Sequence, residues 1–513
     1  MKNSLGRTVP NQGEGVDASV PFVGAFATPA AGRRYAPPLK YRFPGTTKRI
    51  ASLEDVFRAI PVRDGMTLSF HHHFRNGDKV LNLVLETAAK LDLKDLRIAV
   101  SSIFPVHEPL IGHINRGTVS ALDTNYMSGP VAQAISHGIL ANPVMMRTHG
   151  GRARAIECGS LHVDVAFIAA PAADSYGNIT GLQGTAACGS LGYAMPDAEF
   201  ADHVVAITDC LLDYPLSPIS IPQTRVDYVV TVDCVGDPAG IVSGTTRLTN
   251  DPLPLKMAAD AATVIEGAGL IREGFSFQTG AGGASLASAQ FVREMMERAG
   301  VTGSFILGGI TAHAVDMVNK GIFRKLLDVQ GFDLEAVKSI AVNPNHVEIS
   351  SSFYANPFNS GCAVNQLDCV VLGATEIDVD FNVNVATGSD GIIRGGAGGH
   401  SDAAAGAALT MIVARLNRGR YRTVVENVTT VTTPGETVDV LVTDHGIAVN
   451  PRRRDLAERL MAADVPIKDI HELRRMAESF ADAPGPSVTS GRTVAVVEYR
   501  DGTIIDTVRQ IGC

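Results

Sequence analysis

Apolar and polar positions follow regular periods from Ser52 onward. Ser52 precedes a helical pattern at residues 53–60, and a second amphipathic helix is predicted at residues 79–91. Each helix is followed by a short apolar strand, at residues 66–74 and 96–104. Further apolar strands bounded by Asp, Pro or Gly are predicted at residues 163–170, 203–208 and 227–233. Strands and helices that alternate in this way predict a mainly parallel sheet covered by helices.

The same order of elements returns in the second half of the chain. A helix near Pro252 precedes a strand at residues 274–278, a glycine turn, a helix at residues 288–300 and a strand at residues 303–309. We therefore predict an α/β protein with two related domains, each a mainly parallel sheet flanked by helices. The predicted division is an irregular arm at residues 1–50, a domain at residues 51–245 and a domain at residues 246–513.

The two ends of the chain carry weaker patterns. Residues 1–50 are rich in Gly, Pro and Arg, and we expect either an arm that wraps a neighbouring element or a loose tail. Alternating segments near the other end predict antiparallel strands at residues 424–433, 437–449 and 492–511, with helices at residues 453–480 between them. We expect this last stretch to complete the second domain.

Composition excludes several classes of function. The 513 residues include 44 basic and 53 acidic side chains, a net charge of −9, which does not suit a nucleic-acid-binding surface. The seven cysteines are isolated, which argues against a disulfide framework or a zinc cluster and favours a reducing cytoplasm. No signal peptide or membrane span is visible in the sequence. We therefore expect a cytoplasmic α/β enzyme.

Two glycine loops are candidates for anion or oxyanion binding. Gly396-Ala397-Gly398-Gly399 precedes a predicted helix, and Gly280-Ala281-Gly282-Gly283 follows a strand in the same context. Glycine lets backbone N–H groups approach a ligand closely, and a helix start adds positive potential. A structural turn is the alternative reading. Neither loop matches a phosphate-binding GxxxxGKS/T or a full GxGxxG motif, so ATP and NAD are disfavoured.

Glu376, Asp378 and Asp380 share one face of a predicted strand in an otherwise apolar run. A buried glutamate beside glycine N–H groups would suit nucleophilic attack on a thioester. A solvent-facing acidic edge is the other reading, and the pattern alone favours it. No GxSxG motif occurs, and the cysteines lack a catalytic signature, so a serine or cysteine hydrolase is disfavoured.

His71, His72, His73 and Arg75 end the first predicted strand, where ligands bind in α/β proteins. Consecutive strand residues point to opposite faces, so a three-histidine metal site is geometrically poor and no metal is expected. Carboxylate recognition fits better, with Arg75 as a bidentate clamp, and a solvated turn is the alternative. Arg394 and His400 are further candidates because they flank the glycine loop.

A set of segments resembles one known family: SFHHHFRNGD (69–78), residues 159–181, SFQTGAGGASLA (276–287), residues 306–323, GATEIDVDFNVN (373–384), GGAGGHSDAAAGA (395–407) and residues 494–511. Together they make the chain similar to the citrate lyase alpha subunit, the citrate CoA-transferase of that complex, along nearly its whole length. This resemblance implies two CoA-transferase-type domains of the NagB/RpiA-like kind.

The resemblance also implies a reaction and its partners. An acetyl thioester and citrate would give acetate and a citryl thioester, as in citrate fermentation. The thiol would belong to a CoA-derived prosthetic group on the gamma subunit, an acyl carrier protein, with acetyl-CoA as a surrogate. A beta subunit would then cleave the citryl thioester, so an oligomeric complex is implied. This chain itself would hold no bound cofactor.

Roles for single residues follow from the resemblance. Glu376 matches the nucleophilic glutamate of related CoA-transferases, although citrate lyase transferases are described as forming a mixed anhydride in a ternary complex. Gly398 and Gly399 would stabilise the oxyanion on either route. The implied thioester-binding residues are Gln278, Gly280, Gly282, Gly283, Gly396 and His400, and the implied citrate-binding residues are His71, His72, His73, Arg75 and Arg394.

Other functions stay open at this point. The same scaffold could transfer CoA to another acid such as citramalate, or hydrolyse acyl-CoA. A scaffold without turnover, which docks the carrier and lyase subunits, is a non-enzymatic alternative.

Overall fold

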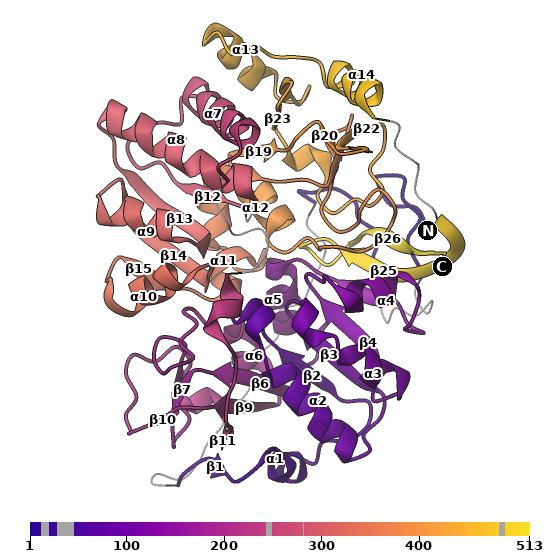
Figure 1. Ribbon diagram of the computed structural model, residues 1–513, viewed down its shortest axis with the longest axis vertical. Helices are drawn as coiled ribbons and strands as arrows, with labels where there is room; N and C mark the ends of the chain where they lie inside the picture. The colour runs from indigo at the N-terminus through magenta and orange to yellow at the C-terminus, as the bar shows by residue number, and fades with distance from the viewer. Residues whose placement is uncertain (12–19, 28–45, 243–248, 281, 482–487, 513) are drawn as a thin grey trace.

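The computed structural model describes residues 1–11, 20–27, 46–242, 249–280, 282–481 and 488–512. Its two halves are each built on a large sheet of mainly parallel strands. Figure 1 shows them one above the other, with the first half below in indigo and purple and the second above in magenta to orange. Helices flank both sheets, as the sequence pattern predicts.

The first sheet has ten strands and holds the first half together. Their order is β1 (Arg49–Ile50), β11 (Tyr228–Thr231), β9 (His203–Thr208), β6 (Val165–Ala170), β2 (Thr67–Phe70), β3 (Leu96–Val100), β4 (Val119–Thr124), β5 (Val144–Met146), β25 (Val488–Glu498) and β26 (Ile504–Ile511). Every neighbouring pair is parallel except β25–β26.

The second sheet has eight strands. Their order is β15 (His346–Glu348), β14 (Phe323–Gly331), β13 (Gly303–Ile310), β12 (Phe277–Thr279), β16 (Cys369–Leu372), β19 (Leu409–Val413), β23 (Val440–Thr443) and β24 (Gly446–Val449), and only β23–β24 is antiparallel. Smaller sheets lie at the strand ends: β10 (Leu211–Leu212) with β7 (Ala172–Asp174) and β8 (Ile179–Thr180), β18 (Val383–Asn384) with β17 (Glu376–Asp378) and β22 (Val424–Val425), and β20 (Asn417–Arg418) with β21 (Tyr421–Arg422).

The helices of the first half are α1 (Leu53–Ala59), α2 (Val80–Lys90), α3 (Leu110–Asn115), α4 (Pro130–Ser136), α5 (His149–Cys158) and α6 (Met195–Phe200). Those of the second half are α7 (Pro252–Gly267), α8 (Gly283–Ala299), α9 (Ala312–Asn319), α10 (Leu334–Val342), α11 (Ser351–Ala355), α12 (His400–Gly406), α13 (Arg454–Ala462) and α14 (Ile470–Phe480). No helix in the described ranges is both long and apolar enough to cross a membrane.

Strand β16 shows why the second sheet is buried on both faces. Cys369 and Val371 pack into one apolar cluster with α7 and α8, whereas Val370 and Leu372 pack into another on the opposite face. Successive strand side chains point to opposite sides, so a continuous apolar run is the expected sequence of a parallel strand covered by helices on both faces.

Local patterns predicted the early elements correctly. The Ser52 side chain accepts a hydrogen bond from the Asp55 N–H and begins α1, as its sequence position indicated. The predicted strands and amphipathic helix of this region are confirmed at β2, α2 and β3. The segment at residues 437–449 is confirmed as the antiparallel pair β23–β24.

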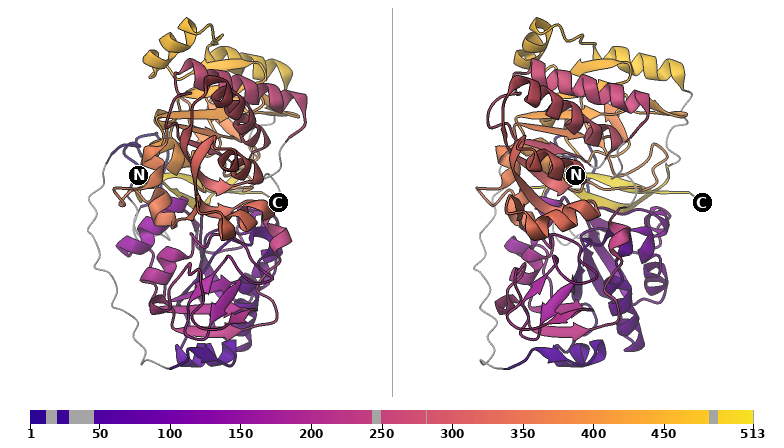
Figure 2. Two further views of the ribbon diagram at one scale, coloured as in Figure 1. Left: turned by 90° about the vertical axis from the view of Figure 1, so that its left-hand side faces the viewer. Right: turned by 60° about the vertical axis from the view of Figure 1, so that its left-hand side comes forward.

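The place of the C-terminal hairpin was predicted wrongly. Residues 492–511 do form an antiparallel hairpin, but β25 pairs with β5 of the first sheet instead of completing the second domain. Val497 and Val508 are buried in the core of the first half, which supplies the apolar surface that this hairpin needs. Figure 2 shows the yellow hairpin lying at the level where the two halves meet. Residues 424–433 contribute only the short strand β22.

Residues 1–11 and 20–27 of the N-terminal arm pack on this hairpin, whereas Arg49–Ile50, also predicted as arm, form β1 at the opposite edge of the first sheet. Phe22 is fully buried, donates its N–H to the Ile504 carbonyl (2.9 Å) and meets the Tyr499 ring edge to face at 5.0 Å. The arm therefore wraps a neighbouring element at residues 20–27. The rest of the predicted arm, at residues 12–19 and 28–45, and the predicted division between residues 245 and 246 lie outside the described residues.

Candidate active site

The carboxyl ends of strands from both sheets meet where the two halves contact each other. Gln330, at the end of β14, donates a hydrogen bond from Nε2 to the His72 carbonyl (2.8 Å). Thr148 and Gly398 form an isolated parallel bridge between the halves. Ligands bind at such strand ends in α/β proteins, so this boundary is the candidate site.

The three consecutive histidines are divided between two faces. The rings of His71 and His73 are nearly parallel with centroids 6.4 Å apart, and His73 Nε2 lies 2.8 Å from the Ala169 carbonyl oxygen. His72 points elsewhere, with Nδ1 2.6 Å from Ser101 Oγ. Strand β2 ends at Phe70, so the histidines lie just after it, and their rings continue its alternation between two faces. The three rings therefore have different partners and do not converge on one point.

A buried ion pair supports His71. Arg152 donates from both terminal nitrogens to the carboxylate of Asp197 (2.6 Å each), and His71 Nε2 lies 3.3 Å from the same carboxylate. Burial alone would raise the pKa of Asp197, but Arg152 and His71 outweigh it and lower that pKa. The negative charge of Asp197 is thus compensated, and His71 is held in place.

Arg75 lies between aromatic rings from the two halves. Its guanidinium carbon is 5.2 Å from the Phe104 ring centroid and 5.3 Å from that of Phe332. Burial lowers the pKa of Arg75, and Tyr126 and Tyr193 partly oppose this effect. A guanidinium in such surroundings stays charged and suits recognition of a carboxylate.

Arg394 does not join this cluster. Its guanidinium forms a bidentate ion pair with Asp390 (2.5 and 2.7 Å), and its side chain is 53% exposed. Position beside the glycine loop was the reason to expect a role for Arg394, but the local turn directs its side chain to Asp390 on the surface.

The first glycine loop is held closely by its neighbours. Gly398 has a φ of 51°, donates its N–H to the Asn125 carbonyl (3.1 Å) and accepts the His149 N–H (2.7 Å). A Cβ at Gly396 would lie 2.3 Å from the Asn125 carbonyl oxygen, so close backbone approach also requires glycine there. The Gly398 N–H is therefore used, whereas those of Gly396, Ala397 and Gly399 donate no bond among the hydrogen bonds of the described residues.

Tyr354 and Gln278 cover Gly399. Gln278 Nε2 donates to Tyr354 Oη (2.9 Å), and both side chains are buried. A Cβ on Gly399 would lie 2.5 Å from that phenol oxygen. Burial raises the pKa of Tyr354, so its hydroxyl keeps its proton. Gln278 therefore acts on the loop through Tyr354 in this structure.

The second glycine loop lies beside the end of β16. The Gly280 N–H donates to the Val371 carbonyl (2.7 Å), and Ser285 Oγ donates to the carbonyls of Gly280 (3.0 Å) and Gly282 (2.9 Å). Helix α8 then begins at Gly283, and Ala281 lies outside the described residues. The loop is thus closed on Ser285, at the carboxyl end of the strand next to β16.

His400 connects the end of β16 with the first glycine loop. Its Nε2 lies 2.9 Å from the Gly373 carbonyl oxygen and its Nδ1 lies 2.8 Å from Thr433 Oγ1. Burial lowers the pKa of His400 to about 4, so the ring is neutral at pH 7. The two glycine loops therefore flank one strand end, which their matching sequence contexts did not by themselves predict.

Glu376 is buried, which corrects the reading of an exposed acidic edge. It is 2% exposed, and its carboxylate accepts hydrogen bonds from Asn384 Nδ2 (2.9 Å), Thr429 N–H (2.7 Å) and Thr429 Oγ1 (3.1 Å). Asp378 is also buried and hydrogen-bonded, whereas Asp380 is exposed. Strands β18 and β22 cover β17 on both sides, which the local pattern did not indicate.

Sequence reasoning missed His149, Tyr193, Tyr354 and Asp402. His149 begins α5, and its ring stacks on that of His72 (5.3 Å) and meets that of Tyr193 at a tilt (4.4 Å). Asp402 accepts hydrogen bonds from Thr148 Oγ1 and Gly150 N–H (2.8 Å each). The available signal was the strand-to-helix junction after β5, where Thr148 caps a helix. The partners of these residues come from distant segments, so no local motif marks them.

The buried histidines predict a pH dependence of stability. Burial lowers the pKa of His73 and His400 to about 4 and that of His149 to about 3, against 6.5 in the unfolded chain. Above about pH 6.5 these histidines are neutral in both the folded and the unfolded chain. As the pH falls from there towards about 4, they bind more protons in the unfolded chain than in the folded one. We therefore expect the thermal midpoint to fall over this range.

Asp402 opposes this trend in part, because burial raises its pKa to about 6 and the folded state binds its proton between about pH 4 and 6. Differential scanning fluorimetry at about pH 7, 6 and 5 measures the net effect. A His73→Gln variant should lose less stability on acidification than the unaltered protein. An equal loss of stability in the variant and the unaltered protein would contradict the lowered pKa of His73.

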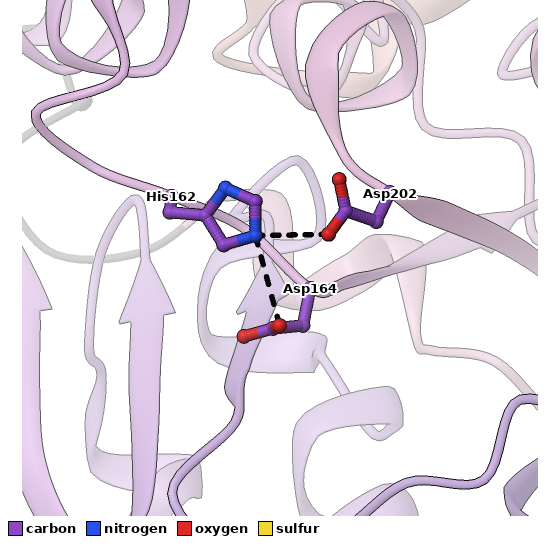
Figure 3. Close-up of side chains that lie close together, drawn as sticks. All are labelled: His162, Asp164 and Asp202. Carbon is purple, nitrogen blue, oxygen red and sulfur yellow. Dashed lines mark hydrogen bonds and ion pairs between the residues drawn. The ribbon is translucent and has the colours of Figure 1, made fainter.

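A group that could offer atoms to a metal ion lies elsewhere. His162 Nε2 is 2.9 Å from Asp202 Oδ2 and 3.7 Å from Asp164 Oδ1, as Figure 3 shows. His162 and Asp202 are exposed, and Asp164 directly precedes β6, at the opposite strand end from the candidate site. Exposed ion pairs of this kind are common on protein surfaces, so the group enters no step below.

Comparisons with known proteins cover nearly the whole chain. Residues 46–511 match the model of a family described as citrate lyase, alpha subunit. The citrate lyase alpha chain of Escherichia coli (strain K12) is 51% identical over 464 residues, 90% of this chain and 91% of that one. The citrate lyase alpha chain of Klebsiella pneumoniae is 51% identical over 460 residues, again 90% and 91%.

Solved structures agree with this match. The alpha subunit of citrate lyase from Streptococcus mutans, crystallised in complex with citrate, has a TM-score of 0.96 and 47% identity, with 100% of both chains covered. A Pseudomonas malonate decarboxylase hetero-tetramer, in complex with malonate, gives a TM-score of 0.63 at 18% identity over 83% of this chain and 85% of that one. The second likeness concerns the fold alone.

Proposed function

Because this chain belongs to the citrate lyase alpha subunit family, we propose that it is a citrate CoA-transferase, which converts an acetyl thioester and citrate into acetate and a citryl thioester. The observation that carries this proposal is the family match from residue 46 to residue 511, which includes every element of the candidate site. The two halves are then CoA-transferase-type domains of the NagB/RpiA-like kind.

Citrate binds beside Arg75 in this proposal. Citrate carries three carboxylates into a protein of net charge −9, so it needs a local cation. Arg75 is held between Phe104 and Phe332, and the neutral rings of His72 and His73 surround the same strand end. The Streptococcus mutans relative was crystallised with citrate, which supports this substrate.

The acetyl thioester binds at the glycine loops. Its thiol belongs to a CoA-derived prosthetic group on the gamma subunit, an acyl carrier protein, and acetyl-CoA acts as a surrogate. A beta subunit then cleaves the citryl thioester, so the chain works within a citrate lyase complex. The six cysteines that the structure describes as free suit a reducing compartment such as the cytoplasm.

The transfer runs through a mixed anhydride. A citrate carboxylate oxygen bonds to the acetyl carbonyl carbon, and the C=O electron pair moves onto oxygen. When the carbonyl re-forms, the C–S bond breaks and the thiolate leaves with its electron pair. The thiolate then attacks the citryl carbonyl carbon of the anhydride, and acetate leaves. The exchange is balanced without any net proton transfer, and the developing oxyanion needs hydrogen-bond donors.

Glu376 is a positioning residue on this route. Its burial and its three hydrogen bonds to Asn384 and Thr429 leave little freedom for attack on a thioester. We expect Glu376→Gln to keep kcat within about thirtyfold, since loss of a true nucleophile costs about 10⁴-fold or more. Borohydride added with acetyl-CoA should leave the unaltered enzyme active. Inactivation with a reduced Glu376 peptide would show a glutamyl thioester and contradict this assignment.

Substrate profiling tests the function itself. The purified chain is incubated with acetyl-CoA and either citrate or citramalate, and the CoA esters and free CoA are separated by liquid chromatography. Citryl-CoA is the expected product. Preferential formation of citramalyl-CoA would indicate a different acid specificity, and free CoA without a new ester would indicate a hydrolase. Retained binding of the carrier without any turnover would indicate a scaffold.

A further inference from the structure

One of the two loop glycines expected to bind the oxyanion has its N–H already occupied. The Gly398 N–H donates to the Asn125 carbonyl, so it is not available to a ligand in this arrangement. The Gly399 N–H supplies one hydrogen bond, whereas oxyanion sites commonly use two donors. A second donor beside Gly399 would complete such a site if acyl transfer takes place there.

We propose that His149 is this second donor and that its Nε2–H binds the carbonyl oxygen of the acyl thioester. The inference rests on the proposed function and assigns a catalytic residue that the glycine motif does not contain. Four observations carry it: the backbone contact between His149 and the loop, the place of the ring, the environment of its two nitrogens and its charge.

The backbone holds His149 directly against the loop. Its N–H donates to the Gly398 carbonyl (2.7 Å), and Thr148 forms the bridge with Gly398. Asp402, two residues into α12, accepts from Thr148 Oγ1 and Gly150 N–H (2.8 Å each). The first turn of α5 is thus attached to the start of α12, and relative movement of His149 and the loop is restricted.

The ring of His149 lies over Gly398. Its Nε2 is 3.4 Å from the point where a Cβ on Gly398 would be, which is ordinary contact distance. The His72 ring stacks on the His149 ring (centroids 5.3 Å apart), and the Tyr193 ring lies against it at a tilt of 44° (4.4 Å), so contacts from two sides hold the ring. A substrate oxygen beside the Gly398–Gly399 peptide would therefore meet Nε2.

The two ring nitrogens have different surroundings. Nδ1 is buried and has no hydrogen-bond partner in the part of the chain that the structure describes, while the residue as a whole keeps partial exposure. A buried N–H without an acceptor is rarer in proteins than an unused acceptor. We therefore place the proton on Nε2, on the side of the ring that faces the loop.

A neutral imidazole suits this role. Burial, together with the positive charges of Arg152 and Arg75, lowers the pKa of His149 to about 3. His72, Tyr193 and Gly398 lie against the ring and are uncharged, and the Asp402 carboxylate at this turn is hydrogen-bonded to Thr148 and Gly150. The ring therefore donates a hydrogen bond without changing charge at neutral pH, as neutral histidines do in other oxyanion sites.

Two substitutions separate donation from packing. His149→Leu keeps the volume without a donor, whereas His149→Gln returns an N–H near the Nε2 position. We expect His149→Leu to lower kcat with acetyl-CoA and citrate about a hundredfold, with the KM for acetyl-CoA changed less than about threefold. The kcat of His149→Gln should be at least about tenfold higher than that of His149→Leu. His162→Leu, which is remote and exposed, should behave like the unaltered chain.

The results distinguish this inference from the proposed function. If the unaltered chain forms no citryl-CoA, the function itself fails. If it does, a kcat of His149→Leu within about threefold of the unaltered chain overturns the inference. If His149→Leu does not fold, His149→Gln decides: a kcat reduced about a hundredfold or more would reject donation. If kcat changes with pH around about 6.5 and the change is absent in His149→Gln, His149 would act as a titrating base instead of a neutral donor.

Discussion

Replacing Arg75 by alanine should raise the KM for citrate about a hundredfold, with the KM for acetyl-CoA changed less than about threefold. The guanidinium lies between Phe104 and Phe332, where little water weakens its attraction for a carboxylate. Initial rates of citryl-CoA formation over a range of citrate concentrations measure the effect. Arg75→Lys keeps the charge but loses the bidentate geometry. Its KM for citrate should therefore lie between that of the unaltered chain and that of Arg75→Ala.

Arg394→Ala is the matched control for Arg75. Both residues are arginines near the predicted site in sequence, but Arg394 is exposed and paired with Asp390. Its removal should change the KM for citrate less than about twofold, because exposed ion pairs contribute little. Equal effects of the two substitutions would contradict the assignment of citrate to Arg75, and so would unchanged citrate dependence in Arg75→Ala.

Gly399→Ala should lower kcat about a hundredfold. The new methyl group would lie 2.5 Å from Tyr354 Oη and 3.2 Å from Tyr354 Cε1, and Gln278 holds that phenol in place. The loop must therefore move, and a displacement of about 1 Å in a catalytic group can cost a hundredfold in rate. The KM for citrate should stay nearly unchanged, since Arg75 is not involved.

Two variants check the cause of this loss. Adding Tyr354→Phe to Gly399→Ala removes the closest contact, so kcat should rise by at least about fivefold over the single variant. Gly361→Ala places a methyl group 3.8 Å from the nearest atom and should leave activity and the thermal midpoint unchanged. A fully active Gly399→Ala enzyme would show that the close contact with Tyr354 does not constrain the loop.

The sequence predicted local elements well because their signals are local. Ser52 caps α1, and the apolar runs of β6 and β16 fit strands that are covered on both faces. It misplaced the C-terminal hairpin because alternation marks a strand but not its partner. The pairing of β25 with β5 joins residues about 350 positions apart, and only the apolar surface of the first half selects it.

In the candidate site, too, features with a local signal were predicted and contacts between distant segments were not. The two-residue period correctly separated His72 from His71 and His73. The two glycine loops were recognised as candidates from their contexts, but their meeting at the end of β16 was not predicted. Burial of Glu376 was not predictable from its own segment, because β18 and β22 provide the cover. His149 was missed for a similar reason, since its contact with Gly398 joins residues from the two halves.

The most direct test of the central claim is mass spectrometry of the chain incubated with acetyl-CoA and isotopically labelled citrate. We expect labelled citryl-CoA and no CoA mass on the peptide that carries Glu376. Citryl-CoA together with that adduct would keep the transferase but make Glu376 its nucleophile. Absence of citryl-CoA, even when the acyl carrier subunit is supplied, would contradict the assignment of this chain as a citrate CoA-transferase.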